Sequence, residues 1–187
     1  MKKHNRHSIR LRGYDYSQDG WYFITICVND FKEVFGEITN NIFTPNKWGT
    51  IVETNLKETI EVRGGKTSID TFQIMPNHLH LIIVIGDKEN LPNIAGFPNT
   101  DSELTQFGSP ISNLGSIIRG IKGRITSQIQ LNERVTDLKL WQRNYYEHII
   151  RDANELKRIR KYIENNPYNW QKDKNFFRKL FLKMVKR

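Results

Sequence analysis

Cysteine is almost absent from this sequence of 187 residues, which contains only Cys27. A single cysteine cannot close a disulfide bond within the chain, and it cannot build a zinc site of several cysteines. Any metal ion would therefore be held by histidine, carboxylate or amide groups. Long apolar runs are also missing, because those at residues 21–28 and 81–85 are far shorter than the roughly 20 residues of a membrane helix. We therefore expect a soluble cytoplasmic protein without a membrane span or a secretory signal.

Acidic residues are scarce relative to basic ones. The chain has 20 Asp and Glu against 29 Lys and Arg, which gives a net charge of +9. The excess is concentrated in a basic N-terminal arm (1–13), which has no acid, and a basic C-terminal tail (171–187), which has one. Such charge favours a polyphosphate partner, above all nucleic acid. The same charges also suit a solvated surface, with a tail helix packed through Phe177, Leu180, Phe181 and Met184.

Hydrophobic periodicity predicts five strands and three helices. The strands are expected at residues 21–28, 35–43, 68–75, 78–85 and 145–150, where aromatic and β-branched residues are concentrated. The helices are expected to begin at residues 44–45, at residues 109–110 and after Asp152, with the third ending before Pro167. Residues 86–109 show no period and are predicted to form a long loop. This order predicts one α+β domain (1–187), an antiparallel sheet with helices packed against it.

Two histidines, His78 and His80, lie on the predicted strand 78–85. Residues two apart on a strand point to the same face, so both imidazoles can converge on one cation while Leu79 faces the core. The strand is apolar enough to be central, and a central strand seldom holds two histidines without a function. A metal site needs at least one further ligand, and a purely structural pair of histidines is the alternative.

Tyr162 and Asn166 are four residues apart on the third predicted helix, so their side chains share a face. They fall at the edge of the apolar stripe on this helix, where a side chain can face a cleft. The amide oxygen of Asn166 would then complete a metal site beside the phenol of Tyr162. The alternative is a tyrosine that packs the core and an asparagine that ends the helix.

Five other residues are weaker candidates for contacts with nucleic acid. His148, on the last predicted strand, would hydrogen-bond a phosphate or orient a ligand. Arg119 and Lys122 flank the apolar stripe of the second helix, while Arg10 and Arg12 precede the first strand beside aromatic residues that stack on bases. The sequence has no Walker phosphate loop, no dinucleotide-binding motif and no Gly-x-Ser-x-Gly motif.

Three segments, in this order, resemble the single-tyrosine HUH transposases, and most of all the REP-associated tyrosine transposases. They are residues 75–83, with Met-Pro-Asn-His-Leu-His-Leu-Ile-Ile, residues 140–151 around Trp-Gln-Arg-Asn-Tyr-Tyr-Glu-His, and residues 162–167, with Tyr-Ile-Glu-Asn-Asn-Pro. Residues 8–16 and 22–27 also look like that group. The resemblance therefore extends from about residue 8 to about residue 170.

The resemblance implies a ferredoxin-like or RRM-like nuclease core that cuts single-stranded DNA. It implies that His78, His80 and Asn166 hold Mg²⁺ or Mn²⁺, and that Tyr162 attacks a DNA phosphate. Insertion-sequence relatives often have Gln at the position of Asn166. The step would give a 5′-phosphotyrosine linkage and a free 3′-hydroxyl, and it can reverse to join strands because one phosphodiester replaces another. The expected substrate is single-stranded or hairpin DNA at the nucleoid, bound by a monomer or a homodimer.

Two other functions fit the same residues. The first is a catalytically inactive protein that binds hairpin DNA or RNA on the same scaffold. The second is a metal phosphodiesterase, in which the histidine pair activates water and Tyr162 is not the nucleophile. The fate of the DNA strand separates these three functions, because only attack by the tyrosine leaves protein and DNA covalently joined.

Overall fold

The main sheet has four strands in the order β4-β5-β1-β6, and every neighbouring pair is antiparallel. The computed structural model describes residues 16, 18–62, 67–86, 113–173 and 179. The strands of the sheet are β1 (Gly20–Cys27), β4 (Thr67–Met75), β5 (His78–Ile85) and β6 (Tyr146–Ile150). The helices are α1 (Lys47–Val62), α2 (Leu114–Glu133) and α3 (Ala153–Glu164), with short 3-10 turns η1 (Asn29–Phe31) and η2 (Asn166–Asn169). The predicted α+β fold with an antiparallel sheet is confirmed.

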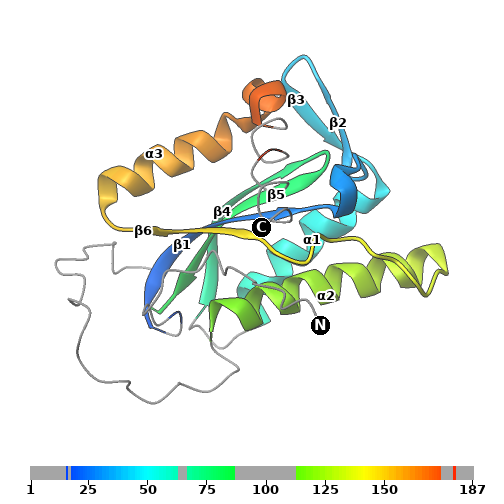
Figure 1. The fold of residues 1–187 in the computed structure, drawn as a ribbon, viewed down its shortest axis with the longest axis horizontal. Coiled ribbons are helices and arrows are strands. Elements are labelled where there is room, and N and C mark those ends of the chain that lie inside the picture. The colour runs from blue at the N-terminus through cyan, green and yellow to red at the C-terminus, as the bar shows by residue number, and fades with distance from the viewer. Residues whose placement is uncertain (1–15, 17, 63–66, 87–112, 174–178, 180–187) are drawn as a thin grey trace, which may run out of the picture.

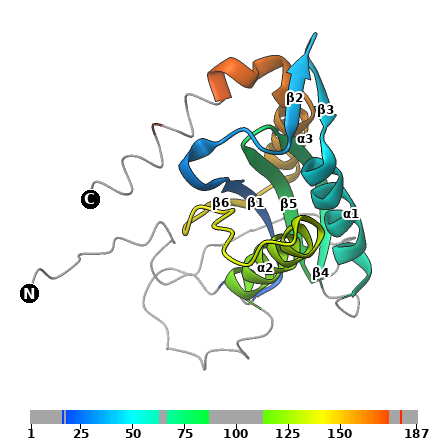
Figure 2. The ribbon, with the colours of Figure 1, turned by 90° about the vertical axis from the view of Figure 1, so that its right-hand side faces the viewer.

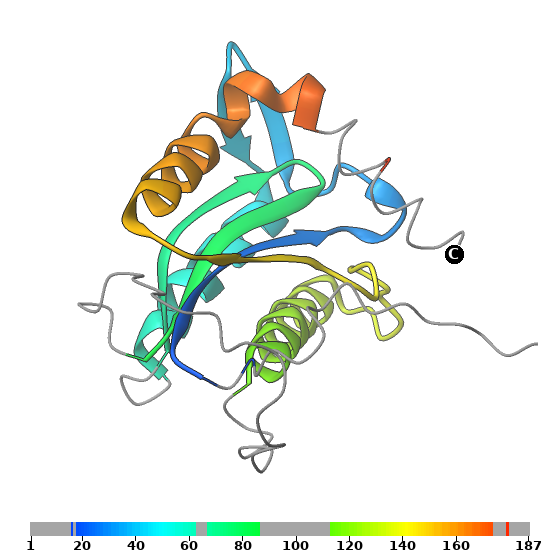
Figure 3. The same ribbon diagram turned by 60° about the vertical axis from the view of Figure 1, so that its left-hand side comes forward.

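The sheet is covered by helices on both faces. On one face, aliphatic side chains of β1 and β5 pack with α1 and α2 into the larger core. On the other face, Trp21, Phe23 and Ile82 pack against α3. Figures 1 and 3 show α3 on one side of the sheet and α2 on the other, and Figure 2 shows α1 beside α2. Because side chains alternate along a strand, the parity of a residue decides which of the two layers it enters.

A half-buried ion pair joins α3 to the edge strand β4. The register of β4 shifts between Ile69 and Thr71, so Asp70 is an extra residue in the strand. Arg160 of α3 donates from Nε and Nη2 to the two carboxylate oxygens of Asp70, at 2.7 and 2.6 Å. Its guanidinium also lies 5.6 Å from the ring centroid of Trp21. These contacts anchor α3 to the sheet two residues before Tyr162.

The predicted strand at residues 35–43 is wrong. The structure has two short strands here, β2 (Gly36–Thr39) and β3 (Ile42–Pro45), which pair only with each other in a separate hairpin. Asn40 and Asn41 form its turn with φ of 54° and 64°. Asparagine tolerates this left-handed conformation, and two such residues in succession are typical of a tight hairpin turn. The Asn-Asn pair is the signal that divides the segment.

The first helix begins later than predicted. Pro45 is the last residue of β3, and α1 starts at Lys47. The side chain of Asn46 accepts hydrogen bonds from the backbone nitrogens of Trp48 and Gly49, both at 3.0 Å. Asn46 thus caps the helix in place of the predicted residues 44–45, because its side chain reaches the free N–H groups of the first turn.

The third helix begins as predicted and ends earlier. Asp152 caps it by accepting a hydrogen bond from the backbone nitrogen of Glu155 at 2.8 Å. The helix ends at Glu164, so the prediction that Asn166 continues the helix of Tyr162 is wrong. Asn166 instead opens the 3-10 turn η2, where Pro167 cannot donate the hydrogen bond that would continue the helix.

Several predicted segments lie outside the described residues. These are the N-terminal arm with Arg10 and Arg12, residues 87–109 of the predicted loop, and most of the C-terminal tail. The start of the second helix at 109–110 is also outside, whereas its body is α2, capped by Asn113. Within the part of the chain that the structure describes, no helix is both long and apolar enough to cross a membrane.

Candidate active site

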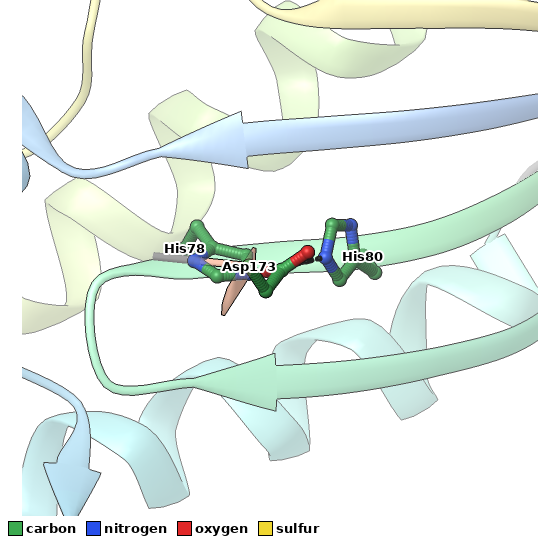
Figure 4. Close-up of side chains that lie close together, drawn as sticks. All are labelled: His78, His80 and Asp173. Atoms are coloured by element: carbon green, nitrogen blue, oxygen red, sulfur yellow. Dashed lines mark hydrogen bonds and ion pairs between the residues drawn. The ribbon is translucent and has the colours of Figure 1, made fainter. Parts of the chain in front are cut away.

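The two histidines of β5 share one face of the sheet, as the strand parity predicts, and the structure places α3 over that face. His78 and His80 are both buried, and the rings are 4.6 Å apart between centroids. Leu79 points into the core on the opposite face. The floor of the site is formed by Phe23 of β1, whose ring is stacked on His80 at 5.4 Å. Figure 4 shows both imidazoles directed toward one carboxylate.

That carboxylate belongs to Asp173, which sequence reasoning did not propose as a site residue. Asp173 Oδ2 lies 2.8 Å from His78 Nε2 and 3.2 Å from His80 Nε2, and its side chain is 3% exposed. Residues 170–173 form a helical turn after η2, and Trp170 stacks on His78 with 5.9 Å between ring centroids. Trp170 and Asp173 are three residues apart and so share one helix face. The available signal was that Asp173 is the one acid in an otherwise basic tail.

The spacing of these three side chains fits a divalent metal ion. His78 Nε2 and His80 Nε2 are 3.1 Å apart, so all three atom pairs, including those with Asp173 Oδ2, lie between 2.8 and 3.2 Å. Imidazole and carboxylate ligands bind divalent ions at about 2.1 Å, so neighbouring ligands at right angles are about 3 Å apart. Two imidazoles and one carboxylate are also a donor set that several divalent transition metals accept.

The hydrogen bonds behind the histidines favour metal binding. The Asn77 amide donates to the carbonyl of Phe31 at 3.2 Å, which leaves its oxygen to accept from His78 Nδ1 at 2.7 Å. With Nδ1 protonated, the 2.8 Å contact between His78 Nε2 and Asp173 needs a second proton on the ring or a cation shared by both groups. His80 Nδ1 lies 2.9 Å from the hydroxyl of Thr25 in the same way. Such partners fix the orientation of metal-binding histidines.

Burial and charge determine the protonation of the cluster. Burial and the neighbouring His78 lower the pKa of His80 to about 4, so its ring is neutral near pH 7 and has a lone pair to offer. Burial alone would raise the pKa of the Asp173 carboxyl, but its contacts with His78 and His80 outweigh burial and hold the pKa well below its usual range. The site therefore combines neutral imidazole with an ionised carboxylate, which are the forms that bind metal.

Tyr162 joins this cluster from α3. Its hydroxyl donates a hydrogen bond to Asp173 Oδ1 and lies 3.5 Å from His80 Nε2. One oxygen of Asp173 thus faces the imidazoles while the other faces the phenol. Burial, followed by the charge and hydrogen bond of Asp173, raises the pKa of Tyr162 above its ordinary value near 10. The phenol is neutral in the metal-free protein and is already in contact with a proton acceptor.

Asn166 is fully buried beside this group. Its amide is close enough to Tyr162 to lower the pKa of the phenol, against the larger effects that raise it. Neither its nitrogen nor its oxygen has a partner in full hydrogen-bond geometry among the described residues. A buried amide without such a partner is costly unless a ligand completes its bonding.

The comparison with known sequences identifies one relative at high coverage. No protein-family model matches the chain. An uncharacterized protein of Haemophilus influenzae is 42% identical over 174 residues, which cover 91% of this chain and 92% of that protein. The chain belongs to the same family as this Haemophilus protein.

Solved structures identify the fold of this family. A REP-associated tyrosine transposase, solved bound to a REP hairpin, aligns with a TM-score of 0.55 and 18% identity over 87% of this chain and 74% of that chain. The chain has the fold of a tyrosine transposase. A protein of Deinococcus radiodurans R1, described as a candidate transposase, aligns with a TM-score of 0.46 and 13% identity over 84% of this chain and 97% of that chain.

The remaining predicted residues lie at different places in this transposase fold. Arg119 and Lys122 are on α2, which covers the face of the sheet opposite to the histidines. Arg119 is exposed, whereas Lys122 Nζ donates to the carbonyls of Gln142 and Asn144 at 2.8 and 3.2 Å. His148 is on the same face as the metal cluster, because its neighbour in the register of β1 is Phe23. The structure therefore brings His148 near Tyr162 and does not bring α2 there.

Proposed function

We propose that the protein is a metal-dependent endonuclease and strand transferase that acts on single-stranded, hairpin-forming DNA, with Tyr162 as nucleophile. One observation carries the proposal: the hydroxyl of Tyr162, two buried imidazoles and a buried carboxylate share one cluster. The transposase fold of the chain agrees with this chemistry. Tyr162 and the two histidines come from elements about 80 residues apart in sequence, yet the hydroxyl of Tyr162 lies 3.5 Å from His80 Nε2. The proposed reaction needs this proximity.

In this proposal His78, His80 and Asp173 hold a divalent ion such as Mg²⁺ or Mn²⁺, and Asn166 offers a further oxygen. When bound, the ion supplies Lewis-acid polarisation of the phosphate and favours the ionised phenol. Asn77 and Thr25 hold the imidazoles in place. The ion is required because the buried phenol keeps its proton without it.

Tyr162 supplies the new bond. Its Oη attacks the phosphorus of a phosphodiester, the bond from phosphorus to the 3′-oxygen breaks, and a 5′-phosphotyrosine forms. The phenol proton, which is hydrogen-bonded to Asp173 Oδ1, is released to solvent, and the departing 3′-oxygen takes up a proton to become a hydroxyl. Attack by a 3′-hydroxyl reverses the step and joins strands. No nucleotide cofactor is consumed, since each phosphodiester is exchanged for another.

The DNA is gripped by basic groups in this proposal. Arg119, His148 and the basic arm with Arg10 and Arg12 are candidate contacts, and Lys122 would have to exchange its carbonyl contacts for a phosphate. A DNA substrate would place the protein at the nucleoid, as a monomer or a homodimer. The solved REP-associated transposase, which was bound to a REP hairpin, supports the choice of a hairpin substrate.

The test is to trap the covalent intermediate. The protein is incubated with a 3′-labelled pool of DNA hairpins that have randomised single-stranded flanks, in Mn²⁺, Mg²⁺ or EDTA. The label is at the 3′ end because a 5′-phosphotyrosine joins the protein to the 3′ part of the cut strand. We expect a protein–DNA adduct on a denaturing gel with the ion and none in EDTA. Tyr162→Phe is expected to lose the adduct, and Tyr168→Phe, which changes a tyrosine that is 66% exposed, is expected to keep it.

The other outcomes identify the competing functions. Cleavage that survives Tyr162→Phe means that metal-activated water attacks the phosphate. Binding of the hairpin pool without cleavage in any ion means that the protein is a binder on the same scaffold. Either result contradicts the proposed tyrosine mechanism, and the adduct that depends on Tyr162 supports it.

A further inference from the structure

A pocket lies beside the buried cluster of His78, His80 and Asp173, and Tyr162 belongs to both. It is an open pocket of about 370 Å³ between β1, β6 and α3. This volume is within the range of sites that hold small ligands. The residues that line it are Phe23, Tyr146, His148, Arg158, Ile159 and Tyr162. Tyr162 is therefore shared, with its hydroxyl in the metal cluster and its ring in the wall of this pocket.

The floor and walls of the pocket are aromatic. Phe23 lies at the base, with the ring of Tyr146 at 6.1 Å and an interplanar angle of 69°, and the ring of Tyr162 at 5.9 Å and 84°. Tyr146 and Tyr162 thus each meet Phe23 in an edge-to-face contact, so neither ring is stacked on Phe23. Every nucleobase has a π-face that can stack on an aromatic side chain, so such a surface binds bases without sequence preference.

Two basic side chains, His148 and Arg158, also line the pocket, and both contact Glu155. Glu155 Oε1 lies 2.8 Å from His148 Nε2 and accepts from Arg158 Nη2 at 3.2 Å. Glu155 itself is anchored, because its Oε2 accepts from the backbone nitrogen of Arg151 at 2.9 Å. The side chain of Arg158 is 76% exposed, so its guanidinium also faces solvent and can meet a phosphate.

We propose that this pocket binds one unpaired nucleotide of the DNA strand next to the cleaved bond, with its base on the ring of Tyr146 and its phosphate at Arg158 and His148. The inference rests on the proposed function, since that function places the scissile phosphate at Tyr162. A nucleotide held on the other side of this ring would position the strand before the attack.

The test separates the contribution of the base from that of the phosphates. Binding is measured by fluorescence anisotropy in EDTA, with a fluorescein-labelled 12-nucleotide oligothymidylate and with an abasic strand of the same length. The Kd of the abasic strand divided by the Kd of oligothymidylate reports the contribution of the bases alone. We expect Tyr146→Leu to lower this ratio about tenfold, because stacking on one aromatic side chain contributes about 1–3 kcal/mol per base. Tyr146→Phe keeps the ring and is expected to keep the ratio within about twofold.

A matched pair on α3 tests the phosphate contact. Arg158→Gln and Lys157→Gln each remove one positive charge from neighbouring exposed residues, but only Arg158 lines the pocket. We expect Arg158→Gln to weaken the binding of both strands about equally. The slope of log affinity against log salt concentration should become smaller by about 0.7, the value for one phosphate of a single strand. Lys157→Gln is expected to change neither quantity.

Two results would overturn the subsite. One is a Tyr146→Leu variant, folded by circular dichroism, that keeps the wild-type ratio; the other is an equal effect of Arg158→Gln and Lys157→Gln. Because binding is measured without metal, these results are independent of cleavage. If the protein forms no adduct but shows the expected ratios, the proposed function is wrong and the subsite is supported. If the adduct forms but the ratios do not change as expected, the proposed function is supported and the subsite is wrong.

Discussion

Replacing Asp173 by asparagine is the sharpest test of the metal cluster. Asparagine has the shape of aspartate and can still accept a hydrogen bond from Tyr162, so the change removes charge and little else. The perturbed group is an ionised carboxylate whose Oδ2 lies within 3.2 Å of both imidazoles. If these three side chains hold the ion, Asp173→Asn removes the only charged ligand among them.

The size of the effect follows from the position of Asp173. Removing a group that merely orients a ligand typically weakens metal binding 10–100-fold. Loss of a ligand that carries the negative charge is expected to cost at least about 100-fold, or roughly 3 kcal/mol. Asn166→Ala removes a neutral oxygen and is expected to cost no more than about tenfold. The order of the two effects distinguishes Asp173 from Asn166 as the principal oxygen ligand.

The assay is titration of the metal-free protein with Mn²⁺ at pH 7.5, followed by the electron paramagnetic resonance of the free ion and by calorimetry. Asp137→Asn, which changes an exposed acid on the loop after α2, is the control for loss of one negative charge. Mn²⁺ affinity in Asp173→Asn equal to that of the control would refute the assignment of this carboxylate as a ligand. A larger loss in Asn166→Ala than in Asp173→Asn would reverse the order argued above.

Two further predictions concern stability. Burial lowers the pKa of Lys122 to about 8, below the roughly 10.4 of an unfolded lysine, so the unfolded chain holds more protons between these values and the free energy of unfolding rises with pH. Denaturant melts should show that the free energy of unfolding of wild type rises, relative to that of Lys122→Met, by up to about 3 kcal/mol from pH 7.5 to 10.5. A difference between the two proteins that stays constant over this pH range would contradict the prediction. Asp70→Asn breaks the pair with Arg160 and should cost about 1–3 kcal/mol in the same melts, whereas Glu53→Gln, in the exposed pair with Lys57, should cost under about 0.5 kcal/mol.

The sheet was predictable because its signal is local. The alternation of β1 and β5 and the apolar stripes of the helices follow from side-chain periods of two and 3.6 residues. The hairpin of β2 and β3 was missed because its length and hydrophobicity also suit one strand, and only the Asn-Asn turn distinguishes the two. The cap of α1 was misplaced for a similar reason, since Thr44 and Asn46 are both good capping residues and the hairpin decides between them.

The site was predictable only in part. His78 and His80 share a face because of strand parity, which the sequence contains. Asp173 meets them through a turn after α3 that reverses the chain, and no local period encodes such a contact across about 93 residues. Lys122 shows the opposite limit: its place on the flank of α2 suggested an exposed cation, but its length lets Nζ reach the carbonyls of the 142–144 loop.

The position of Asp173 links the chemistry of the site to its assembly. Its two oxygens divide between the imidazoles on β5 and the phenol on α3, so one side chain joins the metal cluster to the nucleophile. Trp170, one turn earlier, packs on His78 and holds the same segment against the sheet. Folding of the 170–173 turn therefore places the proposed third metal ligand and the hydrogen-bond acceptor of Tyr162 together, because both are the same carboxylate. For this reason, a change that loosens this turn should weaken metal binding and adduct formation together, while the core of the sheet stays folded.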